Sequence, residues 1–329
     1  MTRCRYGTLS RLAIAGLLAV ALGGPAGAVP VPVAAGVFVE RDSFEPGQQP
    51  DGNSVIFDGP RGIVILDTGR HAAHTQALLD FAQARHERIV AVVNSHWHLD
   101  HLGGNALLRE RVPGLKVIAS TAVAPALRGW LADSRRDMQA MLDAGQADAA
   151  TAQMLRIDIA LIDRGPLLLL PDVALAGPQR NDDAGRPLEI GFAGPSATAG
   201  DLWILDPASG VLASGDLVTL PVPFLDTACP AGWRRALGEL DAQPFTTLVP
   251  GHGAPMSHAA FATWRQAFGA LLDCAASDVP AGRCSAGWLD ALGPLLPADG
   301  HRRAEAMLGY YLAEVLRAPA ARRERDCTP

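Results

Sequence analysis

The stretch Ser95-His96-Trp97-His98-Leu99-Asp100-His101 places four potential metal ligands within six residues. Imidazole and carboxylate groups are ligands that zinc and related divalent ions accept. The stretch follows the run 89–94, whose β-branched residues are typical of a buried strand. In an extended segment, residues two apart point to the same side, as His96 and His98 would. The pattern therefore predicts a metal site at the end of a strand, and the alternative is a polar loop that carries histidines by chance.

The surrounding sequence alternates between strand-like and helix-like patterns. Short β-branched or alternating runs predict strands at 36–40, 54–58, 62–67, 89–94, 167–170, 188–192, 202–205, 211–217 and 246–249. Helical spacing or composition predicts helices at 71–88, within 121–164, and at 231–241, 258–275 and 302–316. Neither a repeat nor an obvious linker interrupts the pattern, so we expect one α/β domain that spans residues 29–329.

The composition excludes several classes of protein. The chain has 329 residues, of which 49% are hydrophobic and 19% are charged, and this balance rules out disordered, collagen-like and coiled-coil chains. Its formal net charge is −6, and the basic residues form no run beyond the N-terminus. We therefore expect no binding to nucleic acid, and the predicted partner is a small-molecule substrate. The oligomeric state stays open.

Residues 1–28 have the pattern of a secretory signal peptide. Basic residues precede the apolar run 12–24, and Ala26-Gly27-Ala28 has the small-x-small form of a cleavage site, with the cut after Ala28. The alternative is a membrane anchor, but a spanning helix needs about 20 apolar residues, more than this run contains. We expect a periplasmic or secreted protein without a stable membrane anchor.

Export changes how the cysteines are interpreted. Four cysteines follow residue 28, and an even number in an oxidising compartment predicts disulfide bonds. Three pairings are possible. The residues between Cys274 and Cys284 include Asp, Pro and Gly, which can turn the chain, so this pair is favoured and leaves Cys229 with Cys327. Free buried thiols are the alternative.

The run His96-x-His98-x-Asp100-His101 resembles the signature of the metallo-β-lactamase superfamily. Three further segments stand in the order of the family's motifs. They are Ile63 to Gly69, Ala213-Ser214-Gly215-Asp216 and Val249-Pro250-Gly251-His252-Gly253. The resemblance covers most of the chain after residue 28. It implies the four-layer αββα sandwich, in which two sheets lie between helices and the metals lie at one edge of the sheets.

The resemblance also implies a role for each residue of these motifs. The ligands are His96 and His98 for one metal, Asp100, His101 and His252 for a second, and Asp216 between the two. Asp67, at the end of an early strand, would support the site by holding a ligand histidine in one tautomer. Asp100 would in addition act in catalysis, by receiving or orienting the proton of the attacking water.

One expected ligand is absent. Family members usually carry a His-Thr-x-Gly-Asp segment, and the matching stretch here is Ala197-Thr198-Ala199-Gly200-Asp201. Because a methyl group cannot bind a metal, we expect one zinc ion to bind firmly and a second to bind weakly. His71, just after the early strand motif, is a possible substitute ligand. The remaining histidines, His74, His86, His258 and His301, have no ligand-like neighbours and are expected at the surface.

Together these features predict an exported zinc enzyme in which a metal-bound hydroxide attacks an amide, lactam, ester or thioester bond. Iron or manganese remain open as alternative metals. Two histidines and a carboxylate (His96, His98 and Asp216) also suit non-heme iron, so an oxidoreductase on the same fold is an alternative. A metal-binding protein whose catalysis is impaired by the change at Ala197 is another.

Overall fold

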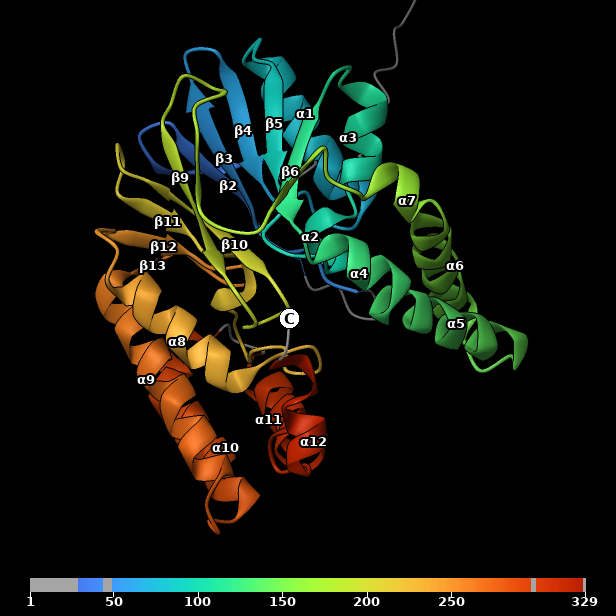
Figure 1. Cartoon of the computed structure of the whole chain (residues 1–329), viewed down its shortest axis with the longest axis vertical. Coiled ribbons are helices and arrows are strands. Elements are labelled where there is room, and N and C mark those ends of the chain that lie inside the picture. The colour runs from blue at the N-terminus through green and yellow to red at the C-terminus, as the bar shows by residue number, and fades with distance from the viewer. Residues whose placement is uncertain (1–28, 44–48, 297–299, 328–329) are drawn as a thin grey trace, which may run out of the picture.

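Two β-sheets lie face to face, with helices on both outer sides (Figure 1). The structure is a computed structural model of the chain, and it describes residues 29–43, 49–296 and 300–327. The arrangement confirms the predicted αββα sandwich. The proposed signal peptide, residues 1–28, lies outside the described residues. Within the described part of the chain, no helix is both long and apolar enough to cross a bilayer.

The first sheet brings two of the sequence motifs together. It has the order β1-β2-β3-β4-β5-β6-β7. The strands are β1 (Val31–Ala34), β2 (Val37–Glu40), β3 (Ser54–Gly59), β4 (Gly62–Leu66), β5 (Ile89–Val93), β6 (Lys116–Ser120) and β7 (Val173–Leu175). Because β4 and β5 run parallel, their carboxyl ends meet at one edge of the sheet. Asp67 therefore emerges beside the stretch that begins at Ser95.

The second sheet brings the two later sequence motifs together. Its order is β13-β12-β11-β10-β9-β8. The strands are β8 (Gln179–Asn181), β9 (Leu188–Ala193), β10 (Asp201–Asp206), β11 (Val211–Ala213), β12 (Thr247–Val249) and β13 (Met256–Ser257). Strands β11 and β12 are parallel, with Ala213 opposite Val249. Asp216 and His252 thus leave the ends of neighbouring strands.

Apolar side chains fill the space between the sheets and the space beneath the helices. Phe57 and Val93 of the first sheet pack with Ile204 and Val249 of the second, and none of the four is more than 1% exposed. Helices α1 (Ala72–Ala84) and α3 (Asn105–Arg111) cover the outer face of the first sheet. Helices α8 (Pro230–Asp241) and α9 (His258–Ala275) cover that of the second. The two sheets are therefore held as a fixed frame for the loops at their edge.

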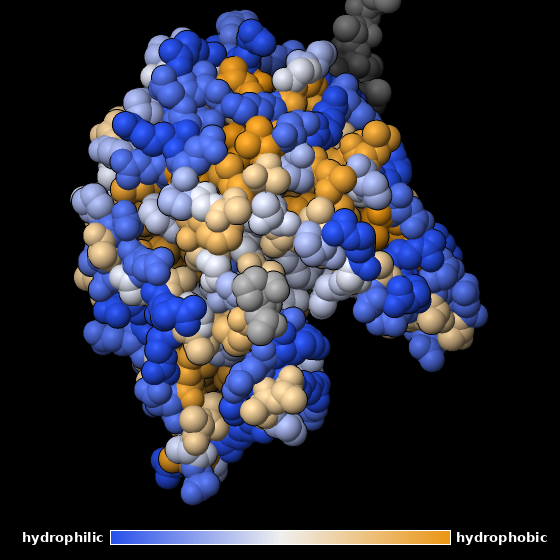
Figure 2. All heavy atoms as spheres, viewed as in Figure 1, coloured by the Kyte–Doolittle hydropathy of each residue, from blue (hydrophilic) through white to orange (hydrophobic). Residues whose placement is uncertain are grey.

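Two groups of helices project beyond the sandwich (Figure 1). The α5–α6 arm consists of α5 (Trp130–Asp143) and α6 (Ala149–Asp163), which follow the short α2 (Leu99–Leu102) and α4 (Val123–Arg128). The C-terminal helices are α10 (Ala281–Leu292), α11 (Gly300–Tyr311), the π-helical turn Leu312–Leu316 and α12 (Ala320–Arg323). Figure 2 shows the surface notched between these two projections.

Some predicted elements are wrong. The leucine run 167–170 does not form a strand. Its first residues belong to α7 (Gly165–Leu168), and β7 begins only at Val173. An unbroken apolar run has no periodicity that separates strand from helix, and Pro166 fits the first turn of a helix. The predicted strand 211–217 ends at Ala213, and a 3₁₀ turn, Gly215–Leu217, follows it.

Both favoured disulfide bonds are present. Cys274 is bonded to Cys284, and Cys229 to Cys327. The first joins the end of α9 to α10, and the second ties the last described residue to the start of α8. The C-terminal helices are thereby fastened at two points to the helices that cover the second sheet.

Candidate metal centre

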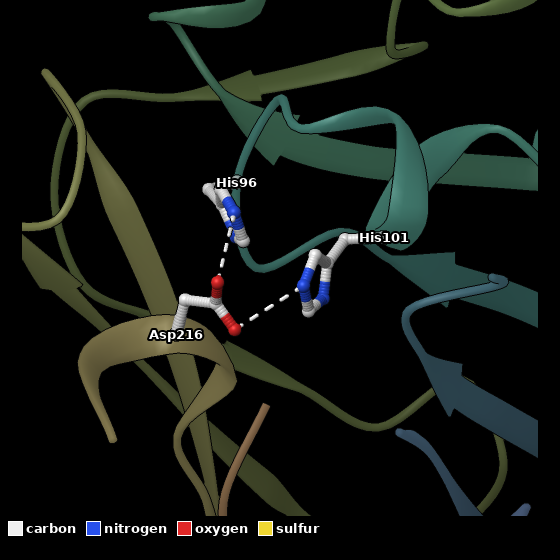
Figure 3. Close-up of side chains that lie close together, drawn as sticks. All are labelled: His96, His101 and Asp216. Atoms are coloured by element: carbon white, nitrogen blue, oxygen red, sulfur yellow. Dashed lines mark ion pairs between the residues drawn. The ribbon is translucent and has the colours of Figure 1, made fainter. Parts of the chain in front are cut away.

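The six predicted ligands converge where the edges of the two sheets meet. His96 and His98 lie in the loop after β5, and Asp100 and His101 lie on α2. Asp216 lies on the 3₁₀ turn after β11, and His252 follows β12. All six side chains are buried. Figure 3 shows His96 and His101 reaching from the first sheet's side toward Asp216. The site therefore exists only when the two halves of the sandwich are packed together.

The first group of ligand atoms is centred on Asp216. Its Oδ2 atom lies 3.8 Å from Nε2 of His96, and its Oδ1 atom lies 3.2 Å from Nε2 of His101 (Figure 3). The Nδ1 atom of His98 lies 2.8 Å from Nε2 of His96. His96, His101 and Asp216 are close enough to share one ion.

The second group contains Asp100, His101 and His252. The Nε2 atom of His252 lies 3.2 Å from Oδ2 of Asp100 and 3.3 Å from Nε2 of His101. It also lies 3.6 Å from Oδ1 of Asp216, which is a buried atom with no hydrogen-bond partner in the structure. His101 thus stands between the two groups, whereas the resemblance implies it for the second metal alone.

Hydrogen bonds to Asp67 fix which ring nitrogens face the site. The Ser95 hydroxyl lies 2.6 Å from Oδ2 of Asp67, and this carboxylate can only accept, so the hydroxyl donates. Its contact of 2.9 Å with Nδ1 of His96 is then donated by the ring, which leaves the Nε2 lone pair free. The Nδ1–H of His101 likewise donates to Asp67 at 2.8 Å and turns Nε2 toward the site.

A hydrogen bond to Thr227 fixes which ring nitrogen of His98 faces the site. The Thr227 hydroxyl donates to the backbone carbonyl of Ala197 at 3.2 Å, so it accepts from Nε2–H of His98 at 3.1 Å. The Nδ1 lone pair of His98 therefore faces His96. Ala197 is buried and contributes only this carbonyl. Lone pairs that face one another across 2.8 Å repel unless a proton or a cation lies between them, so the donor set fits a divalent metal.

The pKa values of the ligand histidines also fit a metal centre. Burial holds the pKa of His96 well below its usual value and lowers that of His98 to about 4, so both rings are in the neutral form that binds metals. Burial also disfavours charge on His101, but Asp216, Asp67 and Asp100 outweigh it and hold the His101 pKa well above its usual value. The carboxylates that favour a proton on Nε2 of His101 would equally favour a divalent cation in its place.

The backbone of Asp67 supports this arrangement. Its φ of 63° lies in the left-handed region that few residues other than glycine adopt. The carboxylate is held on both oxygens, because Oδ1 accepts from the backbone N–H of Ser95 at 2.7 Å. Strained residues of this kind persist where surrounding bonds fix them, and they are common at functional sites.

Two other histidines lie away from the cluster. His71, the possible substitute ligand, places Nδ1 at 2.9 Å from Oδ2 of Asp51 and is in neither ligand group. The expectation that His74 lies at the surface is wrong. Its side chain is buried, and its Nε2 atom lies 2.7 Å from the hydroxyl of Ser54. An isolated histidine carries no sequence signal that separates these environments.

The sequence did not indicate several residues of the site. Thr227 is a single threonine that lies 129 residues from His98, so no motif points to it. Ser95 could have been found, because it directly precedes the first ligand. Arg70 also reaches the site. Its Nη1 atom lies 2.6 Å from Asp158 on α6, and its Nη2 atom lies 4.0 Å from Asp100.

Solved structures share this architecture. A metallo-beta-lactamase from Pontibacter korlensis is 21% identical with a TM-score of 0.53, and the match covers 72% of this chain and 98% of that one. A metallo-beta-lactamase from Hirschia baltica is 16% identical with a TM-score of 0.53, covering 72% and 95%. The DIM-1 metallo-beta-lactamase is 16% identical with a TM-score of 0.52, covering 71% and 94%. At these identities the likeness shows the fold.

The sequence gives an independent comparison. No curated protein matches the chain. The sequence model of the metallo-beta-lactamase superfamily matches residues 48–252, a range that begins before β3 and ends at His252. It therefore includes all six candidate ligands and more than half of the chain. The chain belongs to the metallo-β-lactamase superfamily.

Proposed function

We propose that this protein is an exported, zinc-dependent hydrolase that cleaves an amide, lactam, ester or thioester bond. The observation that carries the proposal is the set of inward-facing ring nitrogens, each oriented by a hydrogen bond on the far side of its ring, beside two buried carboxylates. The proposed ligands are His96, His98, Asp100, His101, Asp216 and His252. A structural role alone gives no reason for three buried rings to turn a nitrogen toward one another beside two carboxylates.

A divalent metal held here would polarise the scissile carbonyl and lower the pKa of a bound water. The chain's own contribution centres on Asp100. Burial would raise the Asp100 pKa, but His101, His252 and Arg70 together hold it well below its usual value. Asp100 is therefore ionised at neutral pH, and its carboxylate can accept or orient a proton beside the reacting carbonyl.

The proposed export is supported by the two disulfide bonds. Such bonds persist in oxidising compartments and are rare in the bacterial or eukaryotic cytosol. Cleavage after Ala28 would release residues 29–329, and the first described strand, β1, begins at Val31. N-terminal sequencing of the exported protein would test the cleavage position.

A panel of substrates tests the hydrolase. Zinc-loaded protein is assayed with a β-lactam, a lactone, a p-nitrophenyl ester and an acyl thioester, and we expect turnover of at least one of them. Asp216→Asn should reduce that turnover by at least about 100-fold, because the variant loses a charged ligand. Asp80→Asn, which changes an exposed residue of α1, should leave the turnover unchanged.

Each contrary outcome of the panel leads to a different conclusion. If only Ala197→His turns over any substrate, the natural protein is a metal-binding protein without this activity. If the purified protein contains iron and consumes oxygen with a reducing substrate, the oxidoreductase is correct. Absence of turnover by both proteins at saturating zinc would refute the hydrolase for these bond classes.

A further inference from the structure

A cavity of about 390 Å³ opens directly above Asp100, Asp216 and His252. It lies between the α5–α6 arm and the C-terminal helices, where Figure 2 shows the notch in the surface. Its floor therefore includes candidate metal ligands, and its walls are formed by helices and loops that lie outside the two sheets.

The walls are mostly apolar and come from the α5–α6 arm, from α11 and from the loop before α8. Trp130 and Met138 of α5 and Leu155 of α6 line one side, and Phe224 and Met307 line the other. Met307 lies on α11, beyond the residues that the superfamily model matches. The cavity is therefore shaped in part by a segment that the family's shared sequence does not include.

The two walls meet at a candidate ligand. The ring of His98 packs edge-on against Phe224, with ring centroids 5.1 Å apart, and lies 6.1 Å from the ring of Trp130. The Trp130 side chain is 39% exposed although it is large and apolar. An apolar group bound in the cavity would cover this surface and remove it from water, which is favourable.

Three charged side chains line the walls, namely Arg70, Asp158 and Arg303 of α11. Arg70 and Asp158 form an ion pair of 2.6 Å, and the side chains of both are largely buried. A polar substrate would have to compete with that pair. On the side of α5 and α6, apolar contact is therefore the main attraction for the part of the substrate remote from the reacting bond, and Arg303 lies on the opposite side.

We infer that the cavity binds an apolar acyl group of roughly six to ten carbons, so that the enzyme prefers medium-chain acyl esters or thioesters. This inference rests on the proposed hydrolase function. At roughly 30 Å³ for each methylene-sized group, the cavity holds about a dozen such groups. The carbonyl and the leaving atom at the floor use part of that volume, and the acyl chain takes the rest.

A chain-length series tests the inference. p-Nitrophenyl esters from acetate to decanoate are assayed with the zinc-loaded full chain. The quantity kcat/KM should rise by up to about fourfold for each methylene that becomes buried, and it should level off near eight carbons. A flat series, or one that falls beyond acetate, overturns the inference.

Two methionines of α5 provide a matched pair of variants. Met138 lines the cavity, whereas Met141 lies on the same helix, is 40% exposed and is not part of the cavity. Met138→Gln should lower the ratio of octanoate to acetate kcat/KM by at least about fivefold, and Met307→Gln on the opposite wall should act in the same direction. Met141→Gln should leave the ratio unchanged. Equal effects at Met138 and Met141 contradict the inference.

Binding separates this inference from the hydrolase itself. Calorimetry of the zinc-loaded protein with 1-octanol and 1-butanol should show tighter binding of octanol, weakened by Met138→Gln and unaffected by Met141→Gln. If this pattern appears without ester hydrolysis, the cavity assignment stands and the hydrolase fails. If esters are hydrolysed without any preference for chain length, the hydrolase stands and the cavity assignment fails.

Discussion

The Oδ2 atom of Asp67 lies 2.8 Å from Nδ1 of His101 and also accepts from the hydroxyl of Ser95, which in turn contacts His96. One buried carboxylate thus sets the orientation of two rings, one on each side of Asp216. Both rings present Nε2 to the site as a result. The geometry of the candidate centre therefore depends on a residue that does not itself face the space between the ligands.

Asp67→Asn should weaken zinc binding by about 10–100-fold. An amide nitrogen in place of Oδ2 cannot accept from both Ser95 and His101, so at least one ring loses the bond that fixes its tautomer. Competition with a chromophoric chelator measures the affinity. Asp80→Asn, at an exposed position of α1, is the control. Equal affinities in the two variants would show that Asp67 has no such positioning role.

The number of zinc ions tests the interpretation of Ala197. With limiting zinc, the protein should bind close to one ion for each chain, because the group nearest Ala197 lacks an imidazole that family members usually supply. Ala197→His should bring the count closer to two. Metal analysis after gel filtration gives both numbers. Two firmly bound ions in the natural protein would contradict the prediction.

The main outline of the site was predictable from the sequence because it depends on strand ends. Asp67 follows β4, and the stretch from Ser95 follows β5, so a strand–helix–strand unit suffices to place them together. The approach of Asp216 and His252 could be predicted only through the resemblance. No local pattern shows that the second sheet packs with this edge against the first.

The rest of the site depends on tertiary contacts. Thr227 acts through one hydroxyl that meets His98 from a loop far away in the sequence. Trp130 and Met307 reach the cavity because two projections lean toward it, and no periodicity encodes that direction. The leucine run 167–170 was misassigned for a related reason, since apolar content alone does not determine whether a short segment becomes helix or strand.

Thr227→Val should destabilise the fold by about 1–3 kcal/mol. Valine has nearly the same shape, but it leaves the Nε2–H of His98 without an acceptor and the carbonyl of Ala197 without this donor. Urea denaturation measures the loss. Thr263→Val, at an exposed position of α9, is the control and should change stability by less than about 0.5 kcal/mol. Equal effects would indicate that the Thr227 bonds contribute nothing specific.

Glu40→Gln should stabilise the protein at alkaline pH. The Glu40 side chain is 4% exposed, and burial, together with the nearby Asp51, raises its pKa from 4.5 to about 7. Between these two values the folded state holds a proton that the unfolded state releases, so stability falls as the pH rises through this window.

Glutamine removes that dependence, so the advantage of the variant should be small at pH 4.5 and reach about 1–3 kcal/mol at pH 8. Unfolding free energies measured at both values check this. The matched control is Glu189→Gln, at an exposed position of β9. A constant difference between Glu40→Gln and the natural protein would contradict the assignment.

Removing the two disulfide bonds should have unequal effects. The bond Cys229–Cys327 spans 98 residues, and the bond Cys274–Cys284 spans 10. Chain entropy gives a stabilisation of about 4.7 kcal/mol for the longer loop and about 2.7 kcal/mol for the shorter one.

Each bond joins one buried and one half-buried cysteine, so replacing both partners with alanine costs similar packing in the two cases. Urea unfolding should therefore show that the double variant without Cys229–Cys327 is about 2 kcal/mol less stable than the double variant without Cys274–Cys284. Equal losses would mean that the denatured chain already keeps the C-terminal helices close to α8, so that closing the longer loop restricts it little.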